Sequence, residues 1–420
     1  KLSIMKFASI NLNDFLFTYL KLFIDEENIL WITLDCPAKS TNVLNSALRQ
    51  ELAELIDGIK IGGSLNENNK KIIGIVFKSD KTTGFAAGAD INEFKAIGEH
   101  NDFVKETRDL VSSGWTLYEN LEKFSNQIPT VALINGFCMG GGLEFALACK
   151  YIVTIDHPKT RMSLPEVQLG IYPGWGGIKR LPRRIGAISA FDLMLTGKTV
   201  DSRKAQKIGL SDFSSPPRVT NSTCVRLIKT QPKKRKLSIL NKMLLGILRP
   251  LFSKILVFQV KRRVDPSHYP APFGIIELWN KYDGNPCIDS SIHDRMIGSD
   301  TTKNLIRIFF LRERLKSIGK VNKASHRNKL EHVHVIGAGT MGADIAILCA
   351  SKDFKVTIQD TSEKQIAKAI AGANKFIRRK IKDKYLAQKF IDNLTPDSNG
   401  YGIKHADVII EAITENLDIK

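Results

Sequence analysis

The chain has 420 residues, enough for two or three domains, and its 43% hydrophobic and 25% charged residues are ordinary for a globular protein. No stretch approaches the roughly 18 uninterrupted apolar residues of a membrane-spanning helix, and the six cysteines lack C-x-x-C spacing, so we expect neither a metal centre nor a disulfide framework. The formal net charge of +19 suits an anionic ligand or an anionic membrane surface, whereas no aromatic-basic motif indicates nucleic-acid binding.

Residues 1–210 alternate between short strand patterns and helical patterns. The strand patterns lie at 29–34, 72–77, 130–134 and 151–154. Such alternation predicts an α/β domain.

The rest of the chain divides into two further regions. In residues 211–329 the strand patterns disappear, and charged and apolar residues mix at helical spacing, which predicts a helical linker. In residues 330–420 strand patterns return, which predicts a third region with strands and helices. Its strands are expected up to 336, at 355–359 and at 408–410.

The segment 131–148 is the most informative part of the first region. A strand pattern runs into three glycines at 140–142 and then into an apolar helix with Glu144 in its first turn. Glycines let a backbone approach a ligand closely, and a helix N-terminus offers free N–H groups to negative charge. A second glutamate, Glu166, follows a short extended run.

Two carboxylates at one cleft suit general acid and base chemistry. Each glutamate also has an ordinary explanation when it is taken alone. Glu144 would then compensate a helix dipole from the first turn, and Glu166 would be a solvated loop carboxylate. The glycines and the wider motif decide between these interpretations.

Four sequence blocks together resemble the crotonase (enoyl-CoA hydratase/isomerase) superfamily. They are Gly84-Phe-Ala-Ala-Gly-Ala-Asp-Ile91, Asn135-Gly-Phe-Cys-Met-Gly-Gly-Gly-Leu-Glu144, Leu164-Pro-Glu-Val-Gln-Leu-Gly170 and Gly174-Trp-Gly-Gly-Ile-Lys-Arg-Leu-Pro182. The blocks occur in the order of the family. The resemblance implies an α/β fold in which β-strands and helices form a crotonase-type spiral.

The same resemblance implies a role for each candidate site residue. The backbone N–H groups of Ala89 and Gly141 would form an oxyanion hole for a thioester. Glu144 would orient and deprotonate water, and Glu166 would exchange the proton at the α-carbon. The implied reaction is hydration of 2-trans-enoyl-CoA to 3-hydroxyacyl-CoA, with coenzyme A as part of the substrate.

Two shorter segments, 37–44 and 156–159, resemble the hydratase–dehydrogenase subunit of fatty-acid β-oxidation multienzymes. Lys39 is a candidate contact for a coenzyme A phosphate, with a solvated surface lysine as the equal alternative. The resemblance implies a thiolase β-subunit as partner. It also implies a location in the cytoplasm of a bacterium or the mitochondrion of a eukaryote.

Residues 332–342 carry a dinucleotide-binding fingerprint. A strand pattern leads into G-x-G-x-x-G and a helix start, which would hold a pyrophosphate, and the next strand ends at an acid that favours NAD over NADP. The residues expected to bind the cofactor here are Gly337, Gly339, Thr340, Met341, Gly342 and Asp360.

The segment 406–420 resembles the fourth-strand segment of 3-hydroxyacyl-CoA dehydrogenases. By that match Glu415 and Lys420 would lie along the nicotinamide side of NAD. The catalytic His–Glu pair of that family comes later than Lys420. We therefore expect a partial Rossmann domain, with a doubly wound parallel sheet, and an incomplete dehydrogenase module.

Residues 226–263 contain 12 lysines and arginines and no acidic residue. Basic clusters at 233–236 and 261–263 flank a largely apolar segment, 237–260, which we expect to form one helix. A basic amphipathic helix indicates contact with an anionic membrane surface. The alternatives are a core-packing helix with a solvated basic face, or a cover over the acyl-chain tunnel. Before it, 211–220 lacks the apolar strand usual in the family.

Three classes of function follow from these motifs. The first is an enoyl-CoA hydratase within a β-oxidation multienzyme. The second is a crotonase-fold isomerase or thioester hydrolase, which the product formed from crotonyl-CoA distinguishes from a hydratase. The third is a non-catalytic assembly subunit or relic, which failure to turn over any enoyl-CoA would favour.

Overall fold

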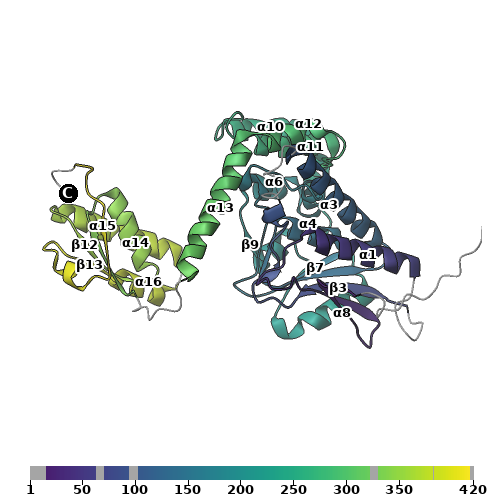
Figure 1. The fold of residues 1–420 in the computed structure, drawn as a ribbon, viewed down its shortest axis with the longest axis horizontal. Helices are drawn as coiled ribbons and strands as arrows, with labels where there is room; N and C mark the ends of the chain where they lie inside the picture. Colours follow the sequence, from purple (N-terminus) through teal and green to yellow (C-terminus); the bar gives the residue numbers. More distant parts are fainter. Residues whose placement is uncertain (1–15, 63–70, 94–102, 322–329, 382, 417–420) are drawn as a thin grey trace, which may run out of the picture. The chain divides into compact units, whose positions relative to one another are not determined.

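The computed structural model describes residues 16–62, 71–93, 103–321, 330–381 and 383–416. Contacts divide the chain into two compact units, Lys1–Glu313 and Arg314–Lys420. The second unit has a hydrophobic core of its own. Figure 1 shows the helices and strands of each unit.

The first unit is built on a six-stranded sheet in the order β1-β2-β3-β5-β7-β10. Its strands are β1 (Leu20–Ile24), β2 (Ile29–Leu34), β3 (Gly74–Ser79), β5 (Thr130–Ile134), β7 (Tyr151–Ile155) and β10 (Phe213–Ser215). β1 is antiparallel to β2, and the other neighbours are parallel. β2 and β5 are buried along their whole length, which explains why their sequences are mostly apolar rather than alternating.

The four strands predicted in this region correspond to β2, β3, β5 and β7. Two of them agree to the residue, and β3 begins two residues later than expected. The expectation that 211–220 contains no strand is wrong, because β10 pairs with β7 there. The strand has no apolar pattern in the sequence because two of its three residues are serines, and its pairing with β7 is made by backbone groups.

A second sheet has four short strands in the order β4-β6-β8-β9. They are β4 (Gly84–Ala86), β6 (Phe137–Met139), β8 (Arg161–Ser163) and β9 (Val200–Asp201). β4, β6 and β8 are parallel. The chain therefore leaves all three strands at one edge of the sheet, and the segments that follow them carry Ala89, Gly141 and Glu166.

Helices α1 and α3 pack against each other, and α3 and α5 both contact α4. The helices of this part are α1 (Ser46–Gly62), α3 (Phe103–Ser125), α4 (Gly141–Ala148), α5 (Gly177–Ile185), α6 (Ala187–Thr196) and α7 (Ser202–Ile208). Every residue of α4 is buried, as expected for a helix that is apolar on all sides. Glu144 is the one ionisable residue of this helix, and it is buried like the others.

The helices expected as a separate linker lie largely within the first unit. They are α8 (Thr220–Thr230), α9 (Ile239–Leu245), α10 (Arg249–Lys261), α11 (Ala271–Tyr282), α12 (Ser290–Ile297) and α13 (Asp300–Val321). Leu227 and Ile228 of α8 pack on the large sheet. Trp279 of α11 and Met296 of α12 belong to the main core of this unit. Residues 211–313 are thus integral to its packing.

The prediction of a single helix at 237–260 is wrong. α9 ends at Leu245 and α10 begins at Arg249, with a bend of 87° between them. Pro250 explains the break, because in a continuous helix its ring would clash with the carbonyl of Gly246 and one hydrogen bond would be lost. Among the described residues no single helix is long and apolar enough to cross a membrane, although this bent pair meets the criterion by length and composition.

The second unit contains a four-stranded parallel sheet in the order β13-β12-β11-β14. Its elements are β11 (His332–Ile336), α14 (Thr340–Ala350), β12 (Lys355–Gln359), α15 (Glu363–Lys380), α16 (Lys384–Asp392), β13 (Leu394–Pro396) and β14 (Val408–Glu411). The chain order reverses between β11 and β14. Such a switch point is where doubly wound folds bind their ligands, and the Gly-rich turn follows β11 there.

Candidate active site

Glu144 lies in the first turn of α4 and is 2% exposed. One oxygen, Oε1, accepts hydrogen bonds from the backbone N–H groups of Trp175 (2.8 Å) and Gly177 (2.7 Å). These donors belong to the turn-rich loop that precedes α5. The loop therefore fixes the carboxylate at one oxygen.

Glu166 begins the 3-10 turn η2 (Glu166–Leu169) after β8 and is 8% exposed. Its Oε1 lies so close to Gly140 that a Cβ on this glycine would be 3.0 Å away. Its Oε2 is buried and has no hydrogen-bond partner within the described part of the chain. A buried carboxylate oxygen without a partner is costly in a folded protein, and such atoms occur where a ligand or a proton is handled.

The two carboxylates influence each other's protonation. Burial raises the pKa of Glu144 to about 7, against the opposing effects of the Gly177 and Trp175 N–H groups and the Arg180 charge. Burial, followed by the charge of Glu144, raises the pKa of Glu166 well above its usual value. Near neutral pH the pair can therefore hold one proton and one negative charge, which is the state that acid–base chemistry requires.

Ala89 and Gly141 present adjacent backbone N–H groups. A Cβ built on Gly141 would lie 3.4 Å from the Ala89 nitrogen. Gly88, with φ of 99°, turns the chain before Ala89, and its carbonyl is held by the Leu44 N–H at 2.8 Å. Among the described residues neither the Ala89 nor the Gly141 N–H has an acceptor. Two free donors, one at the N-terminus of a buried helix and one in the adjacent loop, can stabilise a developing oxyanion.

Trp175 links these groups, and the sequence did not single it out. Its ring packs against Gly141, where a Cβ would lie 2.5 Å from the ring edge. The Arg49 guanidinium lies 5.2 Å from the ring centroid, and Arg180 Nη1 donates to the Trp175 carbonyl at 3.0 Å. The positions of the two arginines depend on tertiary packing, so no local pattern could have identified them.

Lys39, a candidate phosphate contact, forms an ion pair with Asp90, with 2.6 Å between Nζ and Oδ2. The Lys39 side chain remains 41% exposed. Asp90 follows Ala89 directly, so this lysine fastens the loop that carries an N–H donor of the site.

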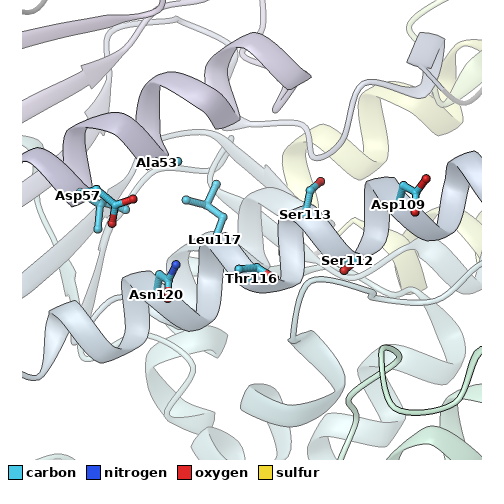
Figure 2. Close-up of a pocket in the computed structure, with 9 residues that line it drawn as sticks. Ala53, Asp57, Asp109, Ser112, Ser113, Thr116, Leu117 and Asn120 are labelled. Atoms are coloured by element: carbon cyan, nitrogen blue, oxygen red, sulfur yellow. The ribbon is translucent and has the colours of Figure 1, made fainter.

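A separate cavity of about 390 Å³ lies between α1 and α3 (Figure 2). Figure 2 shows Ala53 and Asp57 on α1 facing Leu117 and Asn120 on α3. Its lining residues are Ala53, Ile56, Asp57, Asp109, Ser112, Ser113, Thr116, Leu117 and Asn120. None of the residues predicted for catalysis lines it.

The Gly-rich turn of the second unit has the geometry that a dinucleotide requires. Gly337 has φ of 101°, and a Cβ on Gly342 would collide with the Gly337 carbonyl. Among the described residues, a Cβ on Gly339 would meet nothing within 4 Å, and no side chain caps the start of α14. The N–H groups at the start of α14, from Thr340 and Met341 onward, thus face open space, as a pyrophosphate site needs.

Asp360 follows β12 and closes this turn. Its Oδ2 accepts from the Ala338 N–H at 2.7 Å, and its Oδ1 accepts from the Ser362 N–H at 2.8 Å. Each oxygen keeps a further lone pair for a ribose hydroxyl, so the residues present fit NAD. Glu415 lies beyond β14 and is exposed, and Lys420 lies outside the described residues.

Two family models match this chain. The model for enoyl-CoA hydratase/isomerase matches residues 25–244, and the model for the NAD-binding domain of 3-hydroxyacyl-CoA dehydrogenase matches residues 332–420. The chain therefore carries a hydratase/isomerase domain and an NAD-binding dehydrogenase domain.

Curated relatives match most of the chain. The fatty acid oxidation complex subunit alpha of Shewanella baltica is 33% identical over 412 residues, covering 94% of this chain and 56% of its own length. The same subunit from Shewanella loihica is 33% identical over 411 residues, with the same coverage. The chain thus spans little more than half the length of these relatives. The crystal structure of enoyl-CoA hydratase from Bacillus anthracis is 28% identical and covers 50% of this chain and 75% of its own, with a TM-score of 0.43.

Replacing Glu166 by Gln is expected to stabilise the fold, and more at pH 9 than at pH 5. The pKa of Glu166 is raised on folding, so the stability that its carboxyl contributes is fully present below the unfolded pKa and is lost as the pH rises from there through the folded pKa. Chemical denaturation at both pH values tests this, with the exposed Glu54→Gln as control. Equal changes in the free energy of unfolding at pH 5 and pH 9 would contradict it.

The glycines of the second unit should differ in their tolerance of alanine. Gly342→Ala places a methyl group against the Gly337 carbonyl and should cost about 1–3 kcal/mol of stability. Gly339→Ala points into open space and should change stability by less than about 0.5 kcal/mol. Hydrogen exchange of the β11 and β12 amides measures the stability of this unit in both variants. Similar losses of stability in the two variants would contradict the close approach of Gly342 to the Gly337 carbonyl.

Proposed function

Because the chain belongs to the enoyl-CoA hydratase/isomerase family, whose model matches residues 25–244, we propose that its first unit hydrates 2-trans-enoyl-CoA thioesters to 3-hydroxyacyl-CoA. The observation that carries this proposal is the pairing of two buried glutamates, Glu144 and Glu166, beside two free backbone donors. The free N–H groups of Ala89 and Gly141 suit a thioester oxyanion. The carboxyl pair suits the addition of water across a conjugated double bond.

In the proposed reaction, the thioester oxygen accepts hydrogen bonds from the Ala89 and Gly141 N–H groups. Each such donor contributes roughly 3–4 kcal/mol when negative charge develops on that oxygen. Glu144 takes a proton from water as the water oxygen bonds to the β-carbon, and the electrons of the double bond move toward the thioester. Glu166 supplies the proton that completes the α-carbon.

The geometry supports this division of roles. Glu144 Oε1 already accepts two backbone hydrogen bonds, which favours its ionised form and leaves the other oxygen for water. Glu166 Oε2 has no hydrogen-bond partner among the described residues, and burial together with the charge of Glu144 raises the pKa of Glu166, so its proton is available near neutral pH. An isomerase would transfer a proton between two carbon atoms and add no water, so the product formed from crotonyl-CoA distinguishes the two activities.

We further propose that the second unit binds NAD at the turn formed by Gly337 and Gly339. When bound, NAD supplies a hydride acceptor. The product expected from the first unit is a 3-hydroxyacyl-CoA, the class of compound that gives the matched dehydrogenase family its name. This relation supports a place in fatty-acid β-oxidation. The name of the relatives, subunit alpha of a fatty acid oxidation complex, supports a further subunit as partner, and we propose a thiolase for that role.

A contact with an anionic membrane surface is a second proposal, and the α9–α10 pair supports it. Several large apolar side chains of this pair are solvent-exposed, among them Ile239 (78%), Ile247 (85%) and Phe258 (64%). Lys254 and Arg262 are exposed on the same element or directly after it. Exposed apolar residues together with basic residues are typical of peripheral membrane elements.

Removal of either carboxylate is expected to reduce hydration strongly. Glu144→Gln and Glu166→Gln should each lower kcat by about 10²–10⁴-fold, the usual contribution of a general acid or base. The measurement is the loss of absorbance of the conjugated enoyl thioester, with the exposed Glu54→Gln as control. A variant that keeps nearly the normal rate would show that its residue has another role.

Charge reversal on the basic element is expected to weaken membrane binding. Converting Lys254, Lys261 and Arg262 to Glu should lower affinity for phosphatidylserine vesicles by about 10²-fold or more, since each charge contributes about 1 kcal/mol near the surface.

The matched control converts three exposed lysines of α15 to Glu, with the same change in net charge. These are Lys364, Lys368 and Lys375. Vesicle sedimentation compares the two triple variants. An equal loss of binding in both would mean that the whole protein's charge, rather than this element, is responsible.

A further inference from the structure

The backbone of Trp175 connects Glu144 to a buried arginine. Its N–H donates to Glu144 Oε1 at 2.8 Å, and its carbonyl accepts from Arg180 Nη1 at 3.0 Å. The backbone of Trp175 therefore couples the position of the Arg180 guanidinium to that of the Glu144 carboxylate. The second donor to Glu144, the Gly177 N–H, lies two residues further along the same loop.

The guanidinium of Arg180 has anchors outside this loop. The residue is 4% exposed, and its guanidinium is held by two carboxylates of α3. Nη2 lies 2.5 Å from Glu119 Oε1, and Nε lies 2.9 Å from Glu122 Oε2. A planar guanidinium with five donors can make these contacts at once, which a lysine ammonium cannot do in the same geometry.

The loop is shaped to approach this guanidinium. Gly176 has φ of 109°, and a Cβ at this position would collide with Arg180 Nη1. The backbone between Trp175 and Gly177 therefore closes directly over the charged group. This close approach places the two N–H groups on the side of Glu144.

We propose that Arg180 is a positioning residue, which holds the Trp175 carbonyl and thereby keeps the Trp175 and Gly177 N–H groups on one oxygen of Glu144, so that the other oxygen is free to accept a proton. The function of that free oxygen rests on the hydratase reaction proposed above. The positioning itself is a property of the contacts and can be measured without turnover.

Loss of Arg180 has a predictable effect on Glu144. Both the Arg180 charge and the two N–H groups lower the pKa of Glu144, so removing them should raise it. The other titratable groups around Glu144 are Glu166 of η2, Tyr118 of α3 and Tyr172 of the loop. Burial raises the pKa of both phenols, which therefore stay neutral in the neutral range. Glu166 is the one neighbour that must be controlled.

Lys179 provides a matched control. Its Nζ lies 2.6 Å from Glu119 Oε1, so it shares an acidic partner with Arg180. Its ammonium lies 5.6 Å from the Trp115 ring centroid and makes no hydrogen bond to Trp175 in the described part of the chain. Lys179→Met thus removes a charge from the same network without touching the loop.

The first experiment titrates the Glu144 carboxyl by infrared difference spectroscopy of the full chain. Glu166→Gln serves as the background so that Glu144 titrates alone, and Glu144→Gln assigns the band. Arg180→Met should raise the midpoint by about one pH unit, as expected when an opposite charge and two oriented donors are lost. Lys179→Met should leave it nearly unchanged. A folded Arg180→Met protein with an unshifted midpoint would overturn the proposal.

The second experiment measures hydration of crotonyl-CoA against pH with Glu166 present. Arg180→Met should move the acid limb of kcat/KM to higher pH, with a loss of about 10-fold at pH 6 that largely recovers at pH 9. Arg180→Lys, which keeps the charge, should lie between it and the wild type. A loss of equal size at every pH would overturn the proposal, since it indicates general disruption.

Two further outcomes have defined meanings. If Arg180→Met does not fold, Glu122→Gln removes one anchor of the guanidinium, and a smaller shift of the Glu144 midpoint in the same direction supports the proposal, whereas no shift opposes it. If the wild type does not hydrate any enoyl-CoA but the infrared midpoint shifts, the positioning stands and the hydratase proposal fails.

Discussion

Keeping two carboxylates out of water beside free backbone N–H groups is the constraint on which the first unit depends. Glu144 and Glu166 are both nearly inaccessible, and one oxygen of Glu166 has no hydrogen-bond partner among the residues that the structure describes. Such burial is unfavourable by itself, so the surrounding structure must supply the compensating stability. The fully buried helix α4 and the apolar strands β2 and β5 provide it.

Glycine is required where backbone and carboxylate meet. A side chain on Gly140 would press on Glu166, and one on Gly177 would lie 3.0 Å from Glu144 Oε1. The glycine-rich segments are therefore a consequence of the buried carboxylates as well as of the oxyanion donors. This double requirement explains why the motif is so readily visible in the sequence, and why the glutamates and the donors could be predicted together.

Other parts of the site could not be predicted, because their information is not local. Arg180 and Arg49 look like ordinary helical arginines in the sequence, and only tertiary packing shows that one holds the Trp175 carbonyl and the other covers its ring. The same holds for β10, whose pairing with β7 is made by backbone groups. By contrast, Pro250 indicates the break before α10 in the sequence. The prediction of one continuous helix rested on the apolar composition of the segment, and it was wrong.

The positive charge of the chain is unevenly distributed, which its net charge does not show. Residues 226–263 hold 12 of the 62 basic residues and no acidic one, whereas basic groups near the catalytic pair are matched by carboxylates. Arg180 is paired with Glu119 and Glu122, Arg49 with Glu93, and Lys39 with Asp90. Charges close to the site thus set geometry through paired contacts, which screening by salt affects little when they are buried.

The exposed basic residues of 226–263 act over longer distances and are sensitive to ionic strength. The two groups of charges can therefore be separated by salt, because added salt should weaken attraction to an anionic surface while leaving the arrangement around Glu144 intact.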